Sequence, residues 1–359
     1  MSTKIDLNRV LSEFNIDNDL QAYGNGHIND TYCSNPEKYI IQRINTSIFT
    51  NPAELMENIE NVTLFLKEKI KAAGGDPKRE TLTVLKTSNG KSYYEYDENN
   101  VFRAYTFIKN TKTIEDDKTL DDLYSAGKGF GRFQQMLADF PVEKLHETIK
   151  DFHNTPKRVE ALKQAIAEDK AGRAASVKEE IDFALECADF ADTVVRGMES
   201  GEIPSRVTHN DTKINNILFD NTTGEVVAVI DLDTVMPGSM LYDFGDALRM
   251  GASTAAEDET DLSKISFDND CFEYFAKGYL SEMKDVLTPM EIDLLPFSAK
   301  LLTYECGIRF LTDYLNGDTY FKIHREHHNL DRCRSQFKLV REIAQKEEEL
   351  KQIVKNILA

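Results

Sequence analysis

The hydrophobic pattern of the first hundred residues predicts short strands around one long helix. Residues 38–44 (KYIIQRI) form a β-branched run of strand length. Asn51 and Pro52 then match a helix start, with asparagine as the N-cap and proline at the first helical position. Apolar side chains follow at spacings of three and four, which predicts a helix to about Lys71: Leu55, Ile59, Val62 and Leu66.

Further strands are expected on both sides of this helix. Within residues 21–34, short strand-like stretches flank a turn that contains Gly24 and Gly26. After the helix, alternating or continuous apolar positions predict three more strands, at residues 81–85, 92–96 and 101–108. The first part of the chain is therefore predicted to be rich in strands.

After about residue 110 the apolar spacing becomes helical. Long helices are predicted at residues 120–140, 155–167, 176–198, 272–283, 289–315 and 331–358. One interruption lies in the middle, where a short strand at 217–219 and an apolar strand at 226–230 flank a turn. This order predicts an α+β fold with two lobes, an N-terminal lobe of residues 1–109 and a mainly helical lobe of residues 110–359.

The composition is that of a folded and acidic protein. Of 359 residues, 41% are hydrophobic and 29% are charged, and the formal net charge is −19. Such an acidic surface repels phosphate backbones and anionic membranes, so we expect neither nucleic acid nor a membrane as a partner. The five cysteines are scattered without a C-x-x-C pair, and no apolar run approaches the ~20 residues of a membrane span. No signal peptide is evident, so a cytoplasmic protein is expected.

The segment 208–219 (THNDTKINNILF) carries the clearest chemical signal. It contains the spacing H-x-D-x4-N, in which the acidic and amide residues are Asp211 and Asn216, and Asp231 follows the next apolar strand. Phosphoryl transfer from ATP needs a carboxylate that orients the attacking hydroxyl and oxygen donors that hold Mg²⁺ against the phosphates. Because amide and carboxylate oxygens suit Mg²⁺, Asp211 is the candidate catalytic residue, and Asn216 and Asp231 are the candidate metal ligands. The intervening hairpin would bring the two ligands together.

Other interpretations of these residues stay open at this point. Asp211 and Asn216 can instead cap the local backbone of a turn. Asp243 begins a D-F-G sequence, the metal-binding motif of protein kinases, but no apolar strand leads into it. We therefore expect Asp243 to begin a helix of residues 243–250 and to support the catalytic loop, and we prefer Asp231 as the ligand.

A nucleotide site is expected around the N-terminal turn. Gly24 and Gly26 lie in the first hairpin, where a glycine-rich loop covers the phosphates in kinases, although the full G-x-G-x-x-G pattern is incomplete. The phosphate-pairing lysine should lie on the third strand, but Gln42 stands there, and Arg43 falls on the opposite face. Glu60, in the following helix, is either the partner of a basic residue or a surface glutamate.

The stretches 208–220 and 229–246 (THNDTKINNILFD and VIDLDTVMPGSMLYDFGD) resemble the aminoglycoside phosphotransferase and choline kinase superfamily. Within it, the chain resembles the bacterial N-acetylhexosamine 1-kinases through further stretches: YGNGHINDTY (23–32), IIQRINTSIF (40–49), HNTPKR (153–158) and LLTYECGIRFLTDYLNGDTYF (301–321). The resemblance covers nearly the whole chain and includes the glutamine at the lysine position.

The resemblance implies a bilobal protein-kinase-like fold, with a small antiparallel-sheet N-terminal lobe and a large helical lobe. It implies that ATP and Mg²⁺ are used to phosphorylate the anomeric hydroxyl of GlcNAc or GalNAc, by a protein that we expect to be a monomer. Asp211 would orient that hydroxyl, and His27 would lie with the two glycines over the phosphates, within reach of the sugar. Further sugar contacts are expected in the late helix, where helix packing is the alternative role: Arg309, Tyr314 and Tyr320.

Several other functions stay open. A choline kinase needs an aromatic cage, for which tryptophan is best, and the chain has no Trp. An aminoglycoside kinase would need an acidic cleft, which the net charge permits, and a homoserine kinase would leave little trace in the sequence. The missing lysine also allows a nucleotide-binding pseudokinase, but the presence of Asp211, Asn216 and Asp231 argues against that class.

Overall fold

The computed structural model describes residues 5–24, 28–114 and 118–359. Its contacts divide the chain into two compact units, a sheet unit and a helical unit. The sheet unit comprises residues 1–113, 139–150 and 217–237, and the helical unit comprises residues 114–138, 151–216 and 238–359. The expected lobe boundary between residues 109 and 110 stays a prediction.

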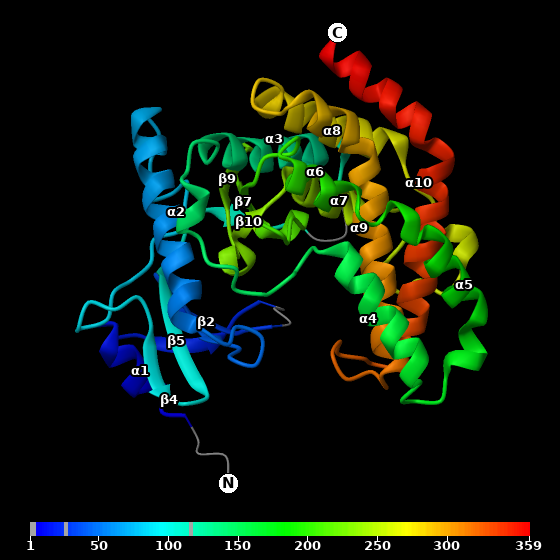
Figure 1. The fold of residues 1–359 in the computed structure, drawn as a ribbon. Helices are drawn as coiled ribbons and strands as arrows, with labels where there is room; N and C mark the ends of the chain where they lie inside the picture. Colours follow the sequence, from blue (N-terminus) through cyan, green and yellow to red (C-terminus); the bar gives the residue numbers. More distant parts are fainter. Residues whose placement is uncertain (1–4, 25–27, 115–117) are drawn as a thin grey trace. The chain divides into compact units, whose positions relative to one another are not determined.

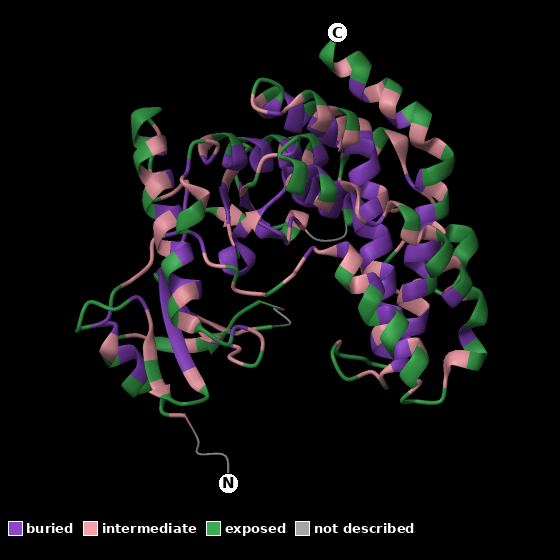
Figure 2. Ribbon diagram, viewed as in Figure 1, coloured by how far each residue is buried: buried purple, intermediate pink, exposed green. Residues whose placement is uncertain are grey.

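The sheet unit contains an antiparallel sheet (Figure 1). Its strands lie in the order β1–β2–β3–β5–β4 and comprise β1 (Asp19–Ala22), β2 (Asp30–Asn35), β3 (Tyr39–Ile44), β4 (Tyr94–Asp97) and β5 (Asn100–Thr106). A second sheet, in the order β6–β8–β9, comprises β6 (Thr111–Lys112), β8 (Ile217–Asp220) and β9 (Val226–Val229). Figure 2 shows that β5 is the most buried strand of the first sheet.

The sheet unit also contains α1 (Leu7–Glu13), α2 (Pro52–Ala72) and the 3₁₀ turns η1 (Val142–Lys144) and η5 (Leu232–Thr234). The Asn51 side chain accepts a hydrogen bond from the backbone N–H of Glu54, and Pro52 follows in the first turn. The start of α2 therefore confirms the predicted cap. Its buried face contains the four predicted apolar residues: Leu55, Ile59, Val62 and Leu66.

Helices form most of the helical unit. In chain order the elements are α3 (Leu120–Met136), α4 (Thr155–Glu168), η2 (Ala174–Val177), α5 (Lys178–Glu186), η3 (Cys187–Phe190), α6 (Thr193–Ser200), β7 (Arg206–Thr208), η4 (Ile214–Asn216), α7 (Met240–Gly251), η6 (Leu262–Lys264), α8 (Asn269–Met283), α9 (Pro289–Leu315) and α10 (His328–Leu358). The strand β10 (Met236–Gly238) spans the chain boundary between the two units. Helix α9 packs along α10, and α3 packs along α8 (Figure 1).

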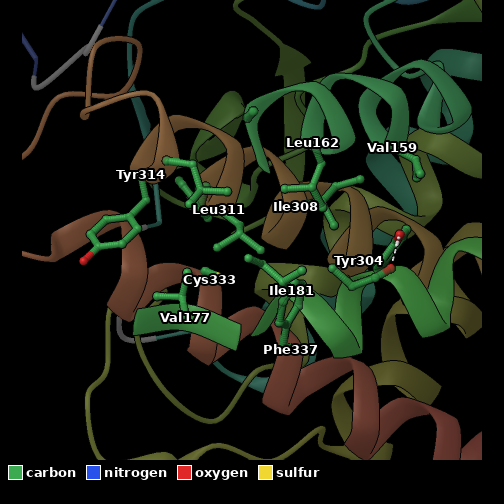
Figure 3. Close-up of a cluster of buried hydrophobic side chains, with 14 of the residues drawn as sticks. Val159, Leu162, Val177, Ile181, Tyr304, Ile308, Leu311, Tyr314, Cys333 and Phe337 are labelled. Atoms are coloured by element: carbon green, nitrogen blue, oxygen red, sulfur yellow. Dashed lines mark hydrogen bonds between the residues drawn. The ribbon is translucent and has the colours of Figure 1, made fainter. Parts of the chain in front are cut away.

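A cluster of buried apolar side chains holds α4, α5, α9 and α10 together (Figure 3). Leu162 of α4 and Ile308 and Leu311 of α9 are fully buried there. The buried hydroxyl of Tyr304 donates a hydrogen bond to the backbone oxygen of Ala184 at 2.7 Å. The one polar group of that side chain is thus satisfied inside the core.

The observed elements confirm the predicted α+β class, but residues 81–85 differ from the prediction. They form an isolated bridge, between Val84 and Tyr105, rather than a strand. The physical reason is that β4 already occupies the neighbouring part of the same edge of β5. The alternating pattern correctly marks an extended segment, but little of the strand edge is left for it to pair with.

The predicted helix over 176–198 is wrong in its continuity. The chain tightens into the turn η3 between α5 and α6. There the Phe190 ring packs edge-on against Phe297 and Tyr304 of α9. Tertiary packing on α9 interrupts the helix here. The apolar spacing of the sequence continues through the turn, so the local pattern does not show the break.

Two further predictions concern the class of protein. Among the described residues, no helix combines the length and the apolar character that crossing a membrane requires. All five cysteines are free, and Cys33 and Cys333 are buried. The cysteines therefore contribute to packing and not to a covalent framework.

Helices α3 and α8 approach so closely that their contact depends on glycine. A Cβ atom on Gly127 of α3 would collide with the carbonyl oxygen of Phe275. A Cβ atom on Gly278 of α8 would collide with the carbonyl oxygen of Tyr124. Close-packed backbones leave no free volume for a methyl group at these positions.

We predict that Gly127→Ala lowers the free energy of unfolding by about 1–3 kcal/mol or more, because α3 and α8 must move apart. The matched control is Gly251→Ala in α7, where the nearest atom to a Cβ would be Leu123 Cδ2, at an ordinary 3.4 Å. Alanine is a better helix former than glycine by up to ~1 kcal/mol, so the control should not lose stability. Urea unfolding measures both values, and equal stability of the two variants would contradict the close contact.

Candidate active site

The loop between β7 and η4 presents Asp211 in the helical unit. Asn210, just before it, has a left-handed backbone with φ of 63°, which asparagine tolerates better than most residues. The buried His209 ring packs edge-on against Phe130 and Phe133. Its Nδ1 accepts a hydrogen bond from the backbone N–H of Asp211 at 3.2 Å. The loop therefore turns sharply into Asp211 and is fixed by a buried side chain.

The carboxylate of Asp243 holds the same loop. It accepts hydrogen bonds from the backbone N–H groups of His209 at 2.8 Å and Asn210 at 2.7 Å, and from the Gln134 side chain at 2.5 Å. Burial raises the pKa of Asp243, while His209 and these hydrogen bonds act in the opposite direction. The predicted supporting role of Asp243 is confirmed, whereas its helix begins earlier, at Met240.

The rest of the D-F-G sequence also has a packing role. A Cβ atom on Gly245 would collide with the carbonyl oxygen of Ser298 in α9, so this glycine permits the close contact of α7 with α9. The Phe244 ring packs edge-on against Phe275 and Tyr279 of α8. Residues 243–245 therefore belong to helix α7, which supports the loop before Asp211.

The side chain of Asp211 contacts one cation and one amide. Lys213 Nζ lies 3.0 Å from Asp211 Oδ1. Asn216 Nδ2 donates to the backbone oxygen of Asp211 at 2.8 Å and to Oδ2 at 3.2 Å. The Asp211 carboxylate, and after it that of Asp246, raises the pKa of Lys213. Because the amide nitrogen of Asn216 makes these contacts, its oxygen is left to coordinate a cation.

Asp231 lies in the sheet unit, directly after β9. Its backbone is left-handed, with φ 59° and ψ 58°, and η5 begins at the next residue, the buried Leu232. Aspartate, like asparagine, is among the few non-glycine residues that adopt this conformation. The structure thus brings Asp211 and Asn216 together in one unit and places Asp231 in the other. The gathering of all three around one metal ion stays a prediction.

Gln42, at the position expected for lysine, binds an arginine. It is paired with Arg103 in the β3–β5 register. Its Oε1 accepts hydrogen bonds from Arg103 Nε at 3.0 Å and Nη2 at 2.8 Å, and its Nε2 donates to Thr31 at 3.1 Å. Arg103 is only 1% exposed, and its Nη1 lies 2.5 Å from Asp233 Oδ1. The cation at this place in the sheet therefore comes from β5 and not from β3.

Arg43 and Glu60, the other charged residues predicted for the nucleotide site, have separate partners. Arg43 Nε donates to Asp30 Oδ2 at 2.8 Å, on the neighbouring strand β2. Glu60 forms an ion pair with Lys86. The partner of Glu60 is thus Lys86 and not a basic residue of β3.

Of the three residues predicted for the phosphate loop, Gly24 lies in the part of the chain that the structure describes. Gly24 has φ of 72°, and a Cβ atom there would meet nothing within 4 Å. Glycine is therefore needed for the backbone conformation and not for space. Gly26 and His27 lie outside the described residues, so their roles stay predictions.

Arg309 and Tyr320 share one neighbourhood in the helical unit. The Arg309 guanidinium lies 5.5 Å from the ring centroids of Phe152 and Phe321. The Tyr320 ring contacts Phe321 edge-on and is 62% exposed. Burial, and then the charge of Arg309, lower the pKa of Arg158, so the two guanidinium groups lie within electrostatic range of each other.

Tyr314 takes part in the core of the helical unit (Figure 3). It is 2% exposed, and the Arg173 guanidinium lies 4.4 Å from its ring centroid. Its hydroxyl is hydrogen-bonded to His327 Nδ1 at 2.9 Å. This is the packing arrangement considered as the alternative, and a sugar contact through Tyr314 stays a prediction.

Three charged residues around these loops are absent from the predictions: Arg103, Lys213 and Asp233. A signal existed for Arg103, because it is the one charged residue in the apolar run 101–107. A charge on the inner face of a strand must have a partner. The spacing of the sequence does not reveal which residue that partner is.

The oxygen donors around the loops fit Mg²⁺. The amide oxygen of Asn216 and the carboxylate of Asp231 are hard ligands of the kind that Mg²⁺ prefers. Within the described part of the chain, no group of three or more His, Cys, Asp or Glu could hold a metal. A Mg²⁺ ion that takes its remaining ligands from phosphates and water does not need such a group.

Comparisons with known proteins agree with the fold. Solved structures that resemble this one include a microcompartment-associated aminopropanol kinase, at 16% identity and a TM-score of 0.65 over 96% of this chain and 97% of that chain. Spectinomycin phosphotransferase, in complex with ADP and spectinomycin, matches at 14% identity and 0.60 over 95% and 97%. An aminoglycoside phosphotransferase from Alicyclobacillus acidocaldarius matches at 11% and 0.60 over 99% and 96%.

At these identities the likeness shows the fold alone, and it confirms an antiparallel sheet combined with a helical part. The family is shown by sequence. A model described as the phosphotransferase enzyme family, APH, matches residues 19–273, which is more than half of the chain. The chain therefore belongs to the APH phosphotransferase enzyme family.

Proposed function

We propose that the protein is a small-molecule kinase that uses ATP and Mg²⁺ to phosphorylate the anomeric hydroxyl of GlcNAc or GalNAc. The arrangement around Asp211 carries this proposal, because a fixed loop combines that carboxylate with the amide of Asn216 and the ammonium of Lys213. Family membership supports the class of reaction. The resemblance of residues 23–32, 153–158 and 301–321 to N-acetylhexosamine 1-kinases supports the sugar.

An adenine nucleotide is the donor that relatives support best. The spectinomycin phosphotransferase structure contains ADP, and that of APH(2'')-IIa contains streptomycin and ATP. Aminoglycoside 2'-phosphotransferase-IIIa was solved with GDP, so GTP is the alternative donor. The expected monomer and the expected cytoplasmic location are further parts of this proposal.

The register of the β8–β9 hairpin supports a joint role for Asn216 and Asp231. Ile217 pairs with Val229 in this hairpin. Along the chain, Asn216 immediately precedes Ile217, and Asp231 follows Val229 by two residues. The chain thus enters and leaves the hairpin at the same end through these two residues. We assign the amide oxygen of one and the carboxylate of the other to Mg²⁺, which when bound neutralises charge on the phosphate oxygens.

Asp211 is assigned to the sugar hydroxyl. Its carboxylate accepts a hydrogen bond from the anomeric O–H and directs the oxygen toward the terminal phosphate. An anomeric hydroxyl is more acidic than an ordinary alcohol, so a carboxylate is a sufficient base. The ammonium of Lys213 lies 3.0 Å from Asp211 Oδ1. The hydrogen bonds that the loop N–H groups of His209 and Asn210 donate to the Asp243 carboxylate limit the motion of Asp211.

The charges around Arg309 favour an uncharged sugar over a cationic substrate. A sugar is bound by directional hydrogen bonds and by aromatic faces, which Arg309, Tyr320 and Phe321 can supply. Choline and aminoglycosides are cations, so Arg158 and Arg309 would repel them. Homoserine carries a carboxylate that the same two arginines would accept, and it is the alternative substrate that this neighbourhood favours.

Product analysis tests the proposed reaction. We expect the protein, supplied with ATP and Mg²⁺, to convert GlcNAc or GalNAc to a product whose phosphorus NMR signal shows coupling to the anomeric proton. Homoserine, choline and kanamycin serve as competing acceptors. Turnover of one of these instead would overturn the sugar assignment, and binding of ATP without turnover of any acceptor would support the pseudokinase.

We predict that Asp211→Asn lowers kcat by about 10²- to 10⁴-fold, because the amide cannot accept the proton of the hydroxyl. The fold should be retained, since Asp211 is partly exposed. Steady-state kinetics and a thermal unfolding curve check both statements. The control is Asp182→Asn, which changes an exposed aspartate of α5 and should leave kcat unaltered. Near-normal turnover by Asp211→Asn would refute the assigned role.

We predict opposite effects for the two other aspartates. Asp231→Asn keeps a residue that tolerates the left-handed backbone, but it removes the carboxylate. The Mg²⁺ concentration for half-maximal rate should therefore rise more than tenfold, which is more than the ~10-fold effect of changing a residue that does not touch the metal.

Asp243→Asn should instead lower the free energy of unfolding by about 1–3 kcal/mol, because a buried acceptor of backbone N–H groups is lost. Mg²⁺ titrations and urea unfolding of both variants decide. The reverse pattern would assign the metal to Asp243.

A further inference from the structure

The buried guanidinium of Arg103 is a charge that the proposed reaction does not use. Burial alone would lower the pKa of Arg103, but the carboxylate of Asp233 and, more weakly, that of Asp231 raise it above its usual value. Arg103 is therefore a permanent cation that lies within electrostatic range of both aspartates. Since it is 1% exposed, it does not itself present a donor to a ligand.

Gln42 fixes the direction in which this cation points. Its Oε1 accepts two hydrogen bonds from Arg103, from Nε and Nη2, and this leaves Nη1 to face Asp233. A lysine at position 42 would bring a second cation against the guanidinium and would remove the acceptor. The glutamine is thus the neutral residue that an arginine at position 103 requires.

Asp233 is held from two sides. Arg103 Nη1 approaches its Oδ1 at 2.5 Å, and Asn29 Nδ2 donates to its Oδ2 at 2.6 Å. Asn29 is itself fixed, because its Oδ1 accepts a hydrogen bond from the backbone N–H of Asn45 at 3.0 Å. Each oxygen of the Asp233 carboxylate therefore contacts a side chain of the sheet unit.

The segment that these contacts hold is the one that follows Asp231. Beyond Asp233, the backbone oxygen of Val235 accepts a hydrogen bond from the Asn58 side chain of α2 at 2.9 Å. Leu232 and Val235 are buried. The turn η5 is thus held at its middle residue, Asp233, and just beyond its end, at Val235.

We propose that Arg103, oriented by Gln42, is a positioning residue for the metal ligand Asp231 and acts on it through Asp233. This inference rests on the proposed function, because it takes Asp231 as a Mg²⁺ ligand. Groups that orient a metal ligand without touching the metal commonly set the affinity of the site. The pair Gln42–Arg103 therefore stands in place of the expected lysine. Its cation orients a protein ligand of the metal, whereas a lysine there would bind phosphate.

Mn²⁺ binding, followed by the EPR signal of the free ion in the presence of saturating ADP, tests the proposal without turnover. Arg103→Lys keeps the charge but loses the planar fork that joins Gln42 to Asp233. Gln42→Leu leaves the ion pair in place and removes the acceptor that orients it. We expect both variants to weaken Mn²⁺ binding by about 10-fold or more, while ADP affinity in EDTA changes by less than about 2-fold.

The matched control is Arg79→Lys. Arg79 pairs with Asp220, at the turn end of the β8–β9 hairpin, with Nη2 2.5 Å from Oδ2. This change removes a similar fork from the same hairpin, but at the end away from Asp231, so Mn²⁺ affinity should stay that of the wild type. A Mn²⁺ affinity that falls as much in this control would overturn the proposal, since any loosening of the hairpin would then suffice.

The remaining outcomes separate this inference from the proposed function. Wild-type Mn²⁺ affinity in folded Arg103→Lys, or an equal loss of ADP affinity in EDTA, overturns the positioning role. If Arg103→Lys does not fold, Gln42→Leu decides by the same two readouts. Asp231→Asn is measured alongside: unchanged Mn²⁺ affinity there refutes the metal assignment itself. Loss in Asp231→Asn with no loss in the other two variants refutes only the role of Arg103.

Discussion

A buried charge must be compensated where it lies, and this constraint shapes both loops that carry the proposed chemistry. In the helical unit, the buried carboxylate of Asp243 is stabilised by the backbone N–H groups of His209 and Asn210, so the loop before Asp211 can take one shape. In the sheet unit, the buried guanidinium of Arg103 is stabilised by Gln42 and Asp233, so the turn after Asp231 is fixed as well. Each unit thus uses one buried charge to hold one polar residue near its surface.

The features that the sequence predicted well are those in which neighbours along the chain determine the structure. The start of α2 follows from Asn51 and Pro52, and its buried face follows from the spacing of its apolar residues. The supporting role of Asp243 could be predicted because no strand leads into it. In each case the information lies within a few residues of the feature.

The features that it did not predict depend on contacts between distant segments. The partner of Arg103 lies far along the chain, and no spacing rule connects position 103 with position 233. The break at η3 arises because Phe190 packs on α9. Residues 81–85 pair with β5 through a single bridge because β4 occupies the neighbouring part of its edge. The sequence around Tyr314 is also compatible with a surface position. Its ring is buried because it packs with residues of α10 and because Arg173 lies over it.

The glutamine at position 42 changes how the charge of a bound nucleotide has to be balanced. In a kinase with lysine on the third strand, that lysine shares the neutralisation of the phosphates with the metal. Here the cation beside position 42, Arg103, is buried and paired with Asp233. Under the proposed function, this share would therefore fall to the metal and to the exposed part of the site. A metal site that carries more of the electrostatic work depends more on the position of each ligand, because the Coulomb energy changes steeply over short distances. If Asp231 binds the metal as proposed, the contacts that hold the turn after it meet this dependence, and the absent lysine and the anchored turn would then belong to one arrangement.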